Sequence, residues 1–121
     1  IGDQAFSGCK KLSNIDIPQS VTHIGENAFS SCNSLTSIVI PKNVTSISEY
    51  TFSSCDNLTS VVIHSKVTFI GNGAFSGCTK LTSITFLGNT LDWNSISLGN
   101  NWNHMVPATR VICSNGIVTL M

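Results

Sequence analysis

Charged side chains are scarce in this sequence of 121 residues, of which only 10% are Asp, Glu, Lys or Arg. An average soluble domain has about 25%. Six basic residues balance six acidic ones, so the formal net charge is zero. Because a neutral chain offers no attractive field to a nucleic acid, an anionic membrane or an acidic substrate, we expect no nucleic-acid partner.

Long apolar runs are also missing. No stretch approaches the ~20 residues that a membrane-spanning helix requires, and no secretory signal pattern is visible at the start. We therefore expect no direct membrane insertion by these residues. The chain begins at Ile1, in the middle of a repeated pattern, and we interpret it as a piece of a longer protein that continues upstream with more repeats.

The sequence lacks every residue constellation that would indicate catalysis. His23, His64 and His104 have no nucleophile or carboxylate near them in a triad-like pattern. No glycine-rich phosphate-binding loop is present, and the cysteines do not form the closely spaced pairs that bind zinc. We therefore expect no enzyme activity, no cofactor and no metal ion.

What the sequence does contain is a repeat with a constant step. The stretch "AFSGCKKLSNIDIP" returns as "AFSSCNSLTSIVIP", "TFSSCDNLTSVVIH" and "AFSGCTKLTSITFL". Five residues recur unchanged at each step, namely Ile1, Phe6, Ser7, Cys9 and Leu12, so that Ile1 returns at positions 24, 47 and 70. A fixed period of about 20–29 residues with a core of the form L-x-x-I-x-I is typical of a leucine-rich repeat solenoid, α/β or mainly β.

Each repeat should contribute one strand to a parallel β ladder. In Leu35–Pro41, Ile38 and Ile40 alternate with Val39, which predicts a strand with the isoleucines inward and Val39 outward. Such a strand has no partner in its own repeat, so it must pair one coil away at ~4.8 Å. We expect strands centred on 15–17, 38–40, 61–63 and 84–86.

The remainder of each repeat should return the chain to the next strand. A second extended piece such as "VTHIG" is expected, followed by a short helix or 3₁₀ turn over "ENAFSSC". Gly2, Gly25 and Gly71 precede this turn, where we expect a tight backbone. The leucine-rich repeats are then 1–23, 24–46, 47–69 and 70–88.

Residues 89–121 break the repeat and are predicted to form a C-terminal capping module. A short amphipathic helix over Asn89–Ile96 would align Leu91, Trp93 and Ile96. Gly99–Pro107 is predicted to be a loop, and Thr109–Leu120 a β-hairpin around the Asn115-Gly116 pair. A cap protects the last coil of a solenoid, whereas the uncovered first coil is a predicted site of self-association.

The repeated cysteines form a row along the stack. They share the inward register of Phe and Leu, so we expect reduced, buried thiols, although neighbouring copies of such a row could also be bridged. A core position is likewise expected for Cys113 in the hairpin. The row consists of Cys9, Cys32, Cys55 and Cys78.

The unit I-G-x-x-A-F-x-x-C-x-x-L-x-x-I-x-I-P-x-x-V-T resembles the repeat of the BspA-like leucine-rich surface proteins. Residues 24–46 match it almost letter for letter, and the third repeat departs from it at Ser48, Thr51 and His64. The tail is similar to the module that closes such arrays in bacterial members. The resemblance implies an extracellular or cell-surface location. In some members it also implies attachment to host matrix proteins such as fibronectin or fibrinogen.

The outward rows of the ladder are the candidate binding face. They consist of Asn14, Asp16, Ser37, Val39, Ser60, Val62, Ser83 and Thr85. Tyr50 and Phe69 occupy columns that are polar in the other repeats, so we expect both to be exposed. The first hypothesis is a non-enzymatic module that binds other proteins or glycans, as an adhesin does. The alternative is a structural spacer and C-terminal cap of a longer array, without a specific ligand.

Overall fold

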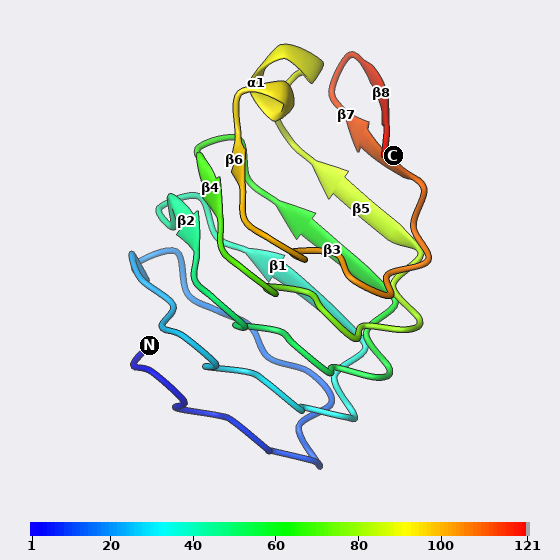
Figure 1. Cartoon of the computed structure of the whole chain (residues 1–121). Helices are drawn as coiled ribbons and strands as arrows, with labels where there is room; N and C mark the ends of the chain where they lie inside the picture. The colour runs from blue at the N-terminus through cyan, green and yellow to red at the C-terminus, as the bar shows by residue number, and fades with distance from the viewer. Residues whose placement is uncertain (121) are drawn as a thin grey trace.

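A computed structural model describes residues 1–120 as a solenoid whose coils stack from the N-terminus to the C-terminus (Figure 1). One side is a five-stranded sheet, and another is a three-stranded sheet. The larger sheet contains, in order, β1 (Ser37–Ile40), β3 (Ser60–Ile63), β5 (Ser83–Phe86), β7 (Arg110–Cys113) and β8 (Gly116–Thr119). The smaller contains β2 (Ser46–Ile47), β4 (Phe69–Ile70) and β6 (Ser97–Leu98), and the helix α1 spans Thr90–Asn94.

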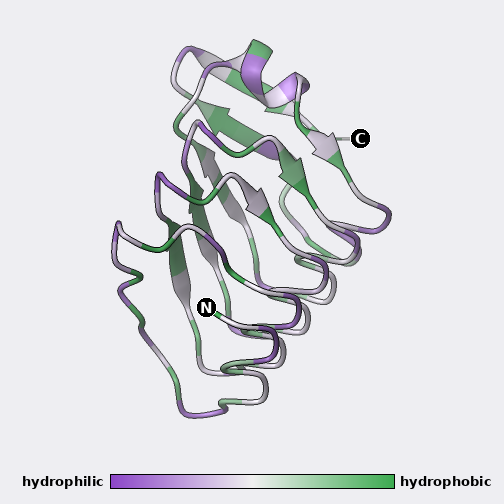
Figure 2. Ribbon diagram, turned by 90° about the vertical axis from the view of Figure 1, so that its left-hand side faces the viewer, coloured by the Kyte–Doolittle hydropathy of each residue, from purple (hydrophilic) through white to green (hydrophobic). Residues whose placement is uncertain are grey.

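The parallel ladder expected from the repeat is confirmed. Val39 pairs with Val62, which pairs with Thr85, so neighbouring strands are aligned in the register of the repeat. Ile38 and Ile40 are buried in β1, whereas Val39 is exposed. The hydropathy colouring shows the same strands as apolar (Figure 2). The second extended piece is confirmed in the second and third repeats by β2 and β4, which pair in parallel, whereas residues 21–25 of the first repeat carry no strand.

The expected helix or 3₁₀ turn is wrong, because this side of the solenoid is a stack of turns. Asn27 and Ser31 have left-handed backbone conformations, with φ of 55° and 58°. These conformations interrupt any helix. They leave main-chain groups free to bond to the next coil, as when the Phe29 N–H donates to the Thr51 carbonyl at 2.9 Å. The turns are therefore joined along the stack, like the strands.

The tight backbone expected at the glycines is a close approach between coils, not a left-handed turn. A Cβ on Gly71 would lie 2.7 Å from the Glu49 nitrogen. A Cβ on Gly2 would meet nothing within 4 Å. Gly2 belongs to the same column but has no coil beneath it, so the restriction comes from the neighbouring coil.

The core is organised as ladders of identical side chains. The rings of Phe6, Phe29, Phe52 and Phe75 stack along the solenoid with centroid separations of 5.2, 5.4 and 5.4 Å. The ladder ends where Trp102 meets Phe75 edge-on, at 6.4 Å and 82°. Offset stacks and edge-to-face contacts are favourable arrangements for aromatic rings, so the tryptophan closes the row without loss of packing.

The cysteine row is composed of free thiols, and those of Cys32, Cys55 and Cys78 each donate to a carbonyl of the coil before. Cys55 Sγ donates to the Phe29 carbonyl at 3.1 Å, and Cys78 Sγ donates to the Phe52 carbonyl at 3.1 Å. Cys113 in the hairpin is buried too, and Cys9 is half-buried. The pKa of Cys32 is raised to about 11, mainly by burial and to a smaller extent by the neighbouring Cys55. The Cys32 thiol therefore stays protonated at neutral pH, and the buried thiols of the row pack as small apolar groups.

The strand expected over residues 15–17 is wrong. This segment carries no strand, and Ile15 and Ile17 are only half-buried. The other sides of the same coil are in place, because the Phe6 N–H donates to the Ala28 carbonyl at 2.7 Å. The side of the first coil that would join the larger sheet lacks pairing. Residues 15–17 have one neighbouring strand, β1, and do not pair with it.

Residues 89–120 continue both sheets, because β6 pairs with β4 and β7 pairs with β5. The helix is shorter than expected. It begins after Asn89, whose side chain accepts from the Asp92 N–H at 2.8 Å. Leu91, expected on the buried face, is 74% exposed, so that part of the prediction is wrong. Trp93 and Ile96 are buried as expected, and Met121 lies outside the described residues.

The hairpin expected near the end of the chain is confirmed by the antiparallel pairing of β7 and β8. Its turn is displaced by one residue, because Cys113 pairs with Gly116 and leaves Ser114 and Asn115 as the loop. The Asn115 side chain bonds outside the hairpin. Its Oδ1 accepts from the Thr90 N–H at 2.8 Å and so connects the hairpin to the start of α1.

Candidate functional site

The outward face of the five-stranded sheet carries a continuous row of apolar and methyl-bearing side chains, here called the apolar row. Pairing places its five members on consecutive strands, in the order Val39, Val62, Thr85, Ile112 and Ile117. Three of them are strongly exposed: Val39 is 51% exposed, Ile112 45% and Ile117 54%. Exposed apolar groups gathered in one strip with a polar rim are typical of a contact surface.

The second predicted row runs beside the first. Ser37, Ser60 and Ser83 begin the three strands β1, β3 and β5, and Ser60 pairs with both of its copies. Ser37 and Ser83 are exposed, and Ser60 is partly exposed. The hydroxyl row gives the apolar row an uncharged polar border along one side.

Ile112 and Ile117 were not predicted from the sequence to lie on this face. Thr85 pairs with Ile112. These two residues are separated by more than one repeat length, because α1 and additional turns lie between β5 and β7. The only signal that could have found them is the alternation in "RVIC", which places Val111 inward and Ile112 outward.

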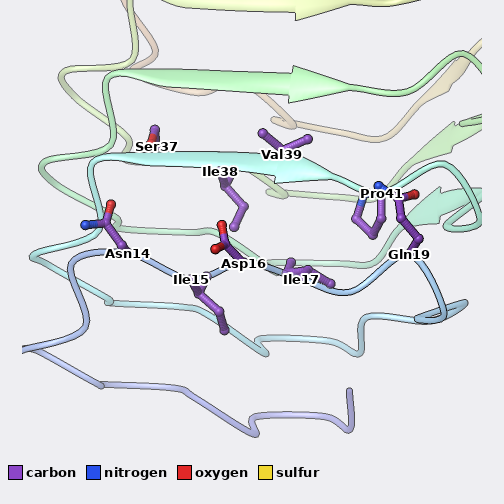
Figure 3. A pocket seen from close by; sticks show the side chains of 9 residues that line it. All are labelled: Asn14, Ile15, Asp16, Ile17, Gln19, Ser37, Ile38, Val39 and Pro41. Carbon is purple, nitrogen blue, oxygen red and sulfur yellow. The ribbon is translucent and has the colours of Figure 1, made fainter.

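A groove of about 510 Å³ lies at the first-coil end of this face. Four of the predicted face residues line it: Asn14, Asp16, Ser37 and Val39. Figure 3 shows residues 14–17 running beside β1, with Asn14 and Asp16 between the two segments. The rest of the lining is mostly apolar and is formed by Ile15, Ile17, Gln19, Ile38 and Pro41.

The groove exists because hydrogen bonds join the first coil to the second at two corners of the coil, near residues 10 and 19, but not between them. At one corner the Ser34 hydroxyl donates to the Lys10 carbonyl. At the other, Asn43 Nδ2 donates to the Gln19 carbonyl at 2.8 Å. Within residues 1–120, no hydrogen bond joins residues 12–17 to 35–40. The segment between the corners therefore runs beside β1 without pairing with it.

The two predicted exposed aromatics are exposed, but neither belongs to the apolar row. Phe69 is 39% exposed and lies in β4 of the smaller sheet. Tyr50 is 45% exposed on the turn side, where its ring lies against Gly73. They do not extend the apolar row into a larger patch.

The described residues contain no arrangement that indicates chemistry. Within residues 1–120, no group of three or more His, Cys, Asp or Glu side chains could hold a metal ion. No helix in this part of the chain is long and apolar enough to cross a membrane. His23 and His104 are exposed on the surface, and His64 is partly exposed. The candidate site is the exposed sheet face and its groove.

Comparison with known proteins agrees with this architecture. The family described as "BspA type Leucine rich repeat region (6 copies)" matches residues 1–103. A crystal structure of a leucine-rich cell surface protein from Faecalibacterium prausnitzii A2-165 superposes with a TM-score of 0.77 at 40% sequence identity. The similarity covers 79% of this chain and 25% of that protein. A comparison with curated proteins gives no match.

The chain belongs to the BspA-type leucine-rich repeat family. It is a parallel β-solenoid, and it spans about a quarter of the length of the cell surface protein that it resembles.

Proposed function

We propose that this chain is a non-enzymatic protein-binding module of a cell-surface or secreted protein, and that it binds through the outward face of the five-stranded sheet. The observation that carries the proposal is the apolar row, which repeats an exposed apolar or methyl-bearing side chain on five consecutive strands. Backbone pairing holds these side chains at fixed spacing, so little backbone entropy is lost when a partner covers them.

The chemistry of the face favours a protein partner. The apolar row has a border of serine hydroxyls, and the described residues of this face carry few charges. An apolar centre with a polar, uncharged rim is typical of a protein–protein interface. Proteins of the host matrix or host cell surface are the partners that we propose to test first, and an extracellular or cell-surface location is part of the same proposal.

The test is a binding screen by surface plasmon resonance of immobilised matrix proteins, including fibronectin and fibrinogen, against the chain. Lysine substitutions in the centre of the row, Val62→Lys and Ile112→Lys, should weaken binding at least tenfold because each leaves a charge in an apolar contact. Phe69→Lys, an exposed apolar residue on the smaller sheet, is the matched control and should bind normally.

A structural spacer and cap is the second candidate function. It is supported by the aromatic closure of the phenylalanine ladder at Trp102 and by the hairpin at the end of the larger sheet. If this candidate is correct, the screen finds no partner, and removal of residues 89–121 destabilises the remaining coils.

A further inference from the structure

We propose that the groove binds a short extended peptide, which adds as a strand to the free edge of β1. This inference rests on the proposed function, because it assigns a ligand class to one end of the same face. Its basis is the combination of an unpaired strand edge, a groove beside that edge and a single carboxylate in the groove lining.

The strand edge faces the groove. The Thr59 N–H donates to the Thr36 carbonyl at 2.9 Å, so the Thr36 carbonyl points toward the coil that carries β3. Main-chain groups alternate in direction along a strand. The N–H and C=O groups of Ser37 and Val39 therefore point away from β3, toward residues 14–17. No strand of the described chain pairs with β1 on this side.

An added strand is the ligand that such an edge recognises. Free N–H and C=O groups along an edge form a template for an extended chain, and main-chain hydrogen bonds then supply the affinity. The four residues of β1 offer an edge of about 13 Å. The hydrogen bonds to the Lys10 and Gln19 carbonyls join the first coil to the second beyond the two ends of this edge.

The lining determines which peptide fits. Asp16 is the only charged residue that lines the groove, and it is exposed. Half-buried Ile15 and Ile17 supply apolar surface on either side of it. We therefore expect a peptide with a lysine or arginine opposite Asp16 and with apolar residues in the alternate positions. A glutamate at the basic position would be repelled.

The peptide specificity can be measured by fluorescence anisotropy with the full chain. The probe is a fluorescein-labelled hexapeptide of alternating threonine and valine with one central lysine, and the matched probe has glutamate in place of lysine. The lysine peptide should bind with a Kd between about 10 μM and 1 mM and the glutamate peptide more weakly. Asp16→Asn should weaken the lysine peptide about two- to fivefold, as expected for an exposed ion pair. Glu26→Gln, which changes an exposed carboxylate that does not line the groove, should have no effect.

The strand edge is tested by Val39→Pro, which removes the N–H that faces the groove. Proline is tolerated on a strand edge, and we expect at least a tenfold loss of affinity. Val39→Thr keeps the N–H and the branched side chain, and should bind like the original chain. If Val39→Pro fails to fold, as judged by circular dichroism, hydrogen exchange of the unmodified chain decides. Saturating peptide should then slow exchange of the Val39 amide and leave the already bonded Ile38 amide unchanged.

Three results would overturn the inference. The lysine peptide could fail to bind at about 1 mM, the upper end of the expected range. Val39→Pro could bind the peptide as tightly as the original chain. The Val39 amide could already be as protected as that of Ile38 in the free chain, which would mean that residues 14–17 close onto β1.

The same variants separate this inference from the proposed function. If Val62→Lys and Ile112→Lys abolish binding of a matrix protein while the peptide does not bind, the inference fails and the proposed function stands. If the peptide binds while those variants change no matrix interaction, the groove is a peptide site and the proposed function fails.

Discussion

Removal of one phenylalanine from the middle of the ladder should cost far more stability than removal of one from its end. Phe52 is fully buried, and its ring stacks between Phe29 and Phe75 with centroids 5.4 Å away on both sides. Phe6 occupies the same position in its coil but is half-buried and stacks only on Phe29. The two substitutions are chemically identical, so any difference between them comes from the neighbouring coils.

For Phe52→Ala the expected loss is about 3–5 kcal/mol, which is typical of a buried phenylalanine that leaves a cavity. For Phe6→Ala we expect about 1–2.5 kcal/mol, because part of its surface is already in contact with water and one ring contact is missing. Since single domains are stable by about 5–15 kcal/mol, the first variant should be close to unfolding at room temperature.

The assay is urea denaturation followed by far-UV circular dichroism, with the original chain and both variants measured together. The m-values must agree before the free energies of unfolding are compared, because a lower m-value would indicate that one coil unfolds separately from the others. Equal losses in the two variants would refute the reasoning. They would show that the contribution of a ring does not depend on having a coil on each side.

The same packing leads to three further predictions. Leu35→Ala should cost about 2–5 kcal/mol because Leu35 is fully buried, whereas Val39→Ala should cost under ~1 kcal/mol in the same urea assay because Val39 is exposed. Gly71→Ala should lower the melting temperature because its Cβ would lie 2.7 Å from the Glu49 nitrogen, while Gly2→Ala should leave it unchanged; equal shifts would contradict the close-approach explanation. Stability should fall as the pH rises from 9 to 11, because burial raises the pKa of Cys32 from 9.0 to about 11, so the unfolded chain loses this proton before the folded chain does. Urea titrations at pH 8 and pH 10 should show a smaller loss for Cys32→Ser than for the original chain, and identical losses would contradict this assignment.

The parallel ladder could be predicted from sequence because a fixed period places identical residues in identical surroundings. Ile38, Val61 and Ile84 occupy the same column of successive repeats, and each is buried at the same position of its strand. The alternation with Val39 then determines which side chains face outward. The part of the candidate face on β1, β3 and β5 follows from this pattern alone.

The turns could not be predicted in the same way, because the left-handed backbone conformation that they need is adopted by several different residue types. The left-handed positions recur along the stack at Gln4, Asn27, Tyr50, Gly73 and Asn101. Only glycine and asparagine favour this conformation. Bonds between adjacent coils, such as that from the Tyr50 N–H to the Asn72 carbonyl at 2.9 Å, stabilise it in the other residues.

The groove could not be predicted, because it forms where residues 14–17 do not pair with β1, and the sequence gives no sign that this pairing is missing. Ile15 and Ile17 repeat the pattern of Ile38 and Ile40, so the sequence predicts a strand in both places. The first segment has no strand because pairing depends on its neighbours as well as on its own residues.

The direction of the hydrogen bonds has a mechanical consequence. In both sheets and in the stack of turns, the bonds between coils run along the long axis of the solenoid, as from the Phe52 N–H to the Ala74 carbonyl. A pulling force along that axis loads the bonds of the outermost coil first, so coils should detach one after another instead of yielding together. Each detached coil, one repeat long, can lengthen the chain from about 4.8 Å to about 80 Å. A solenoid built in this way would act as an extensible tether, because it absorbs a sudden load by detaching coils before the whole stack gives way.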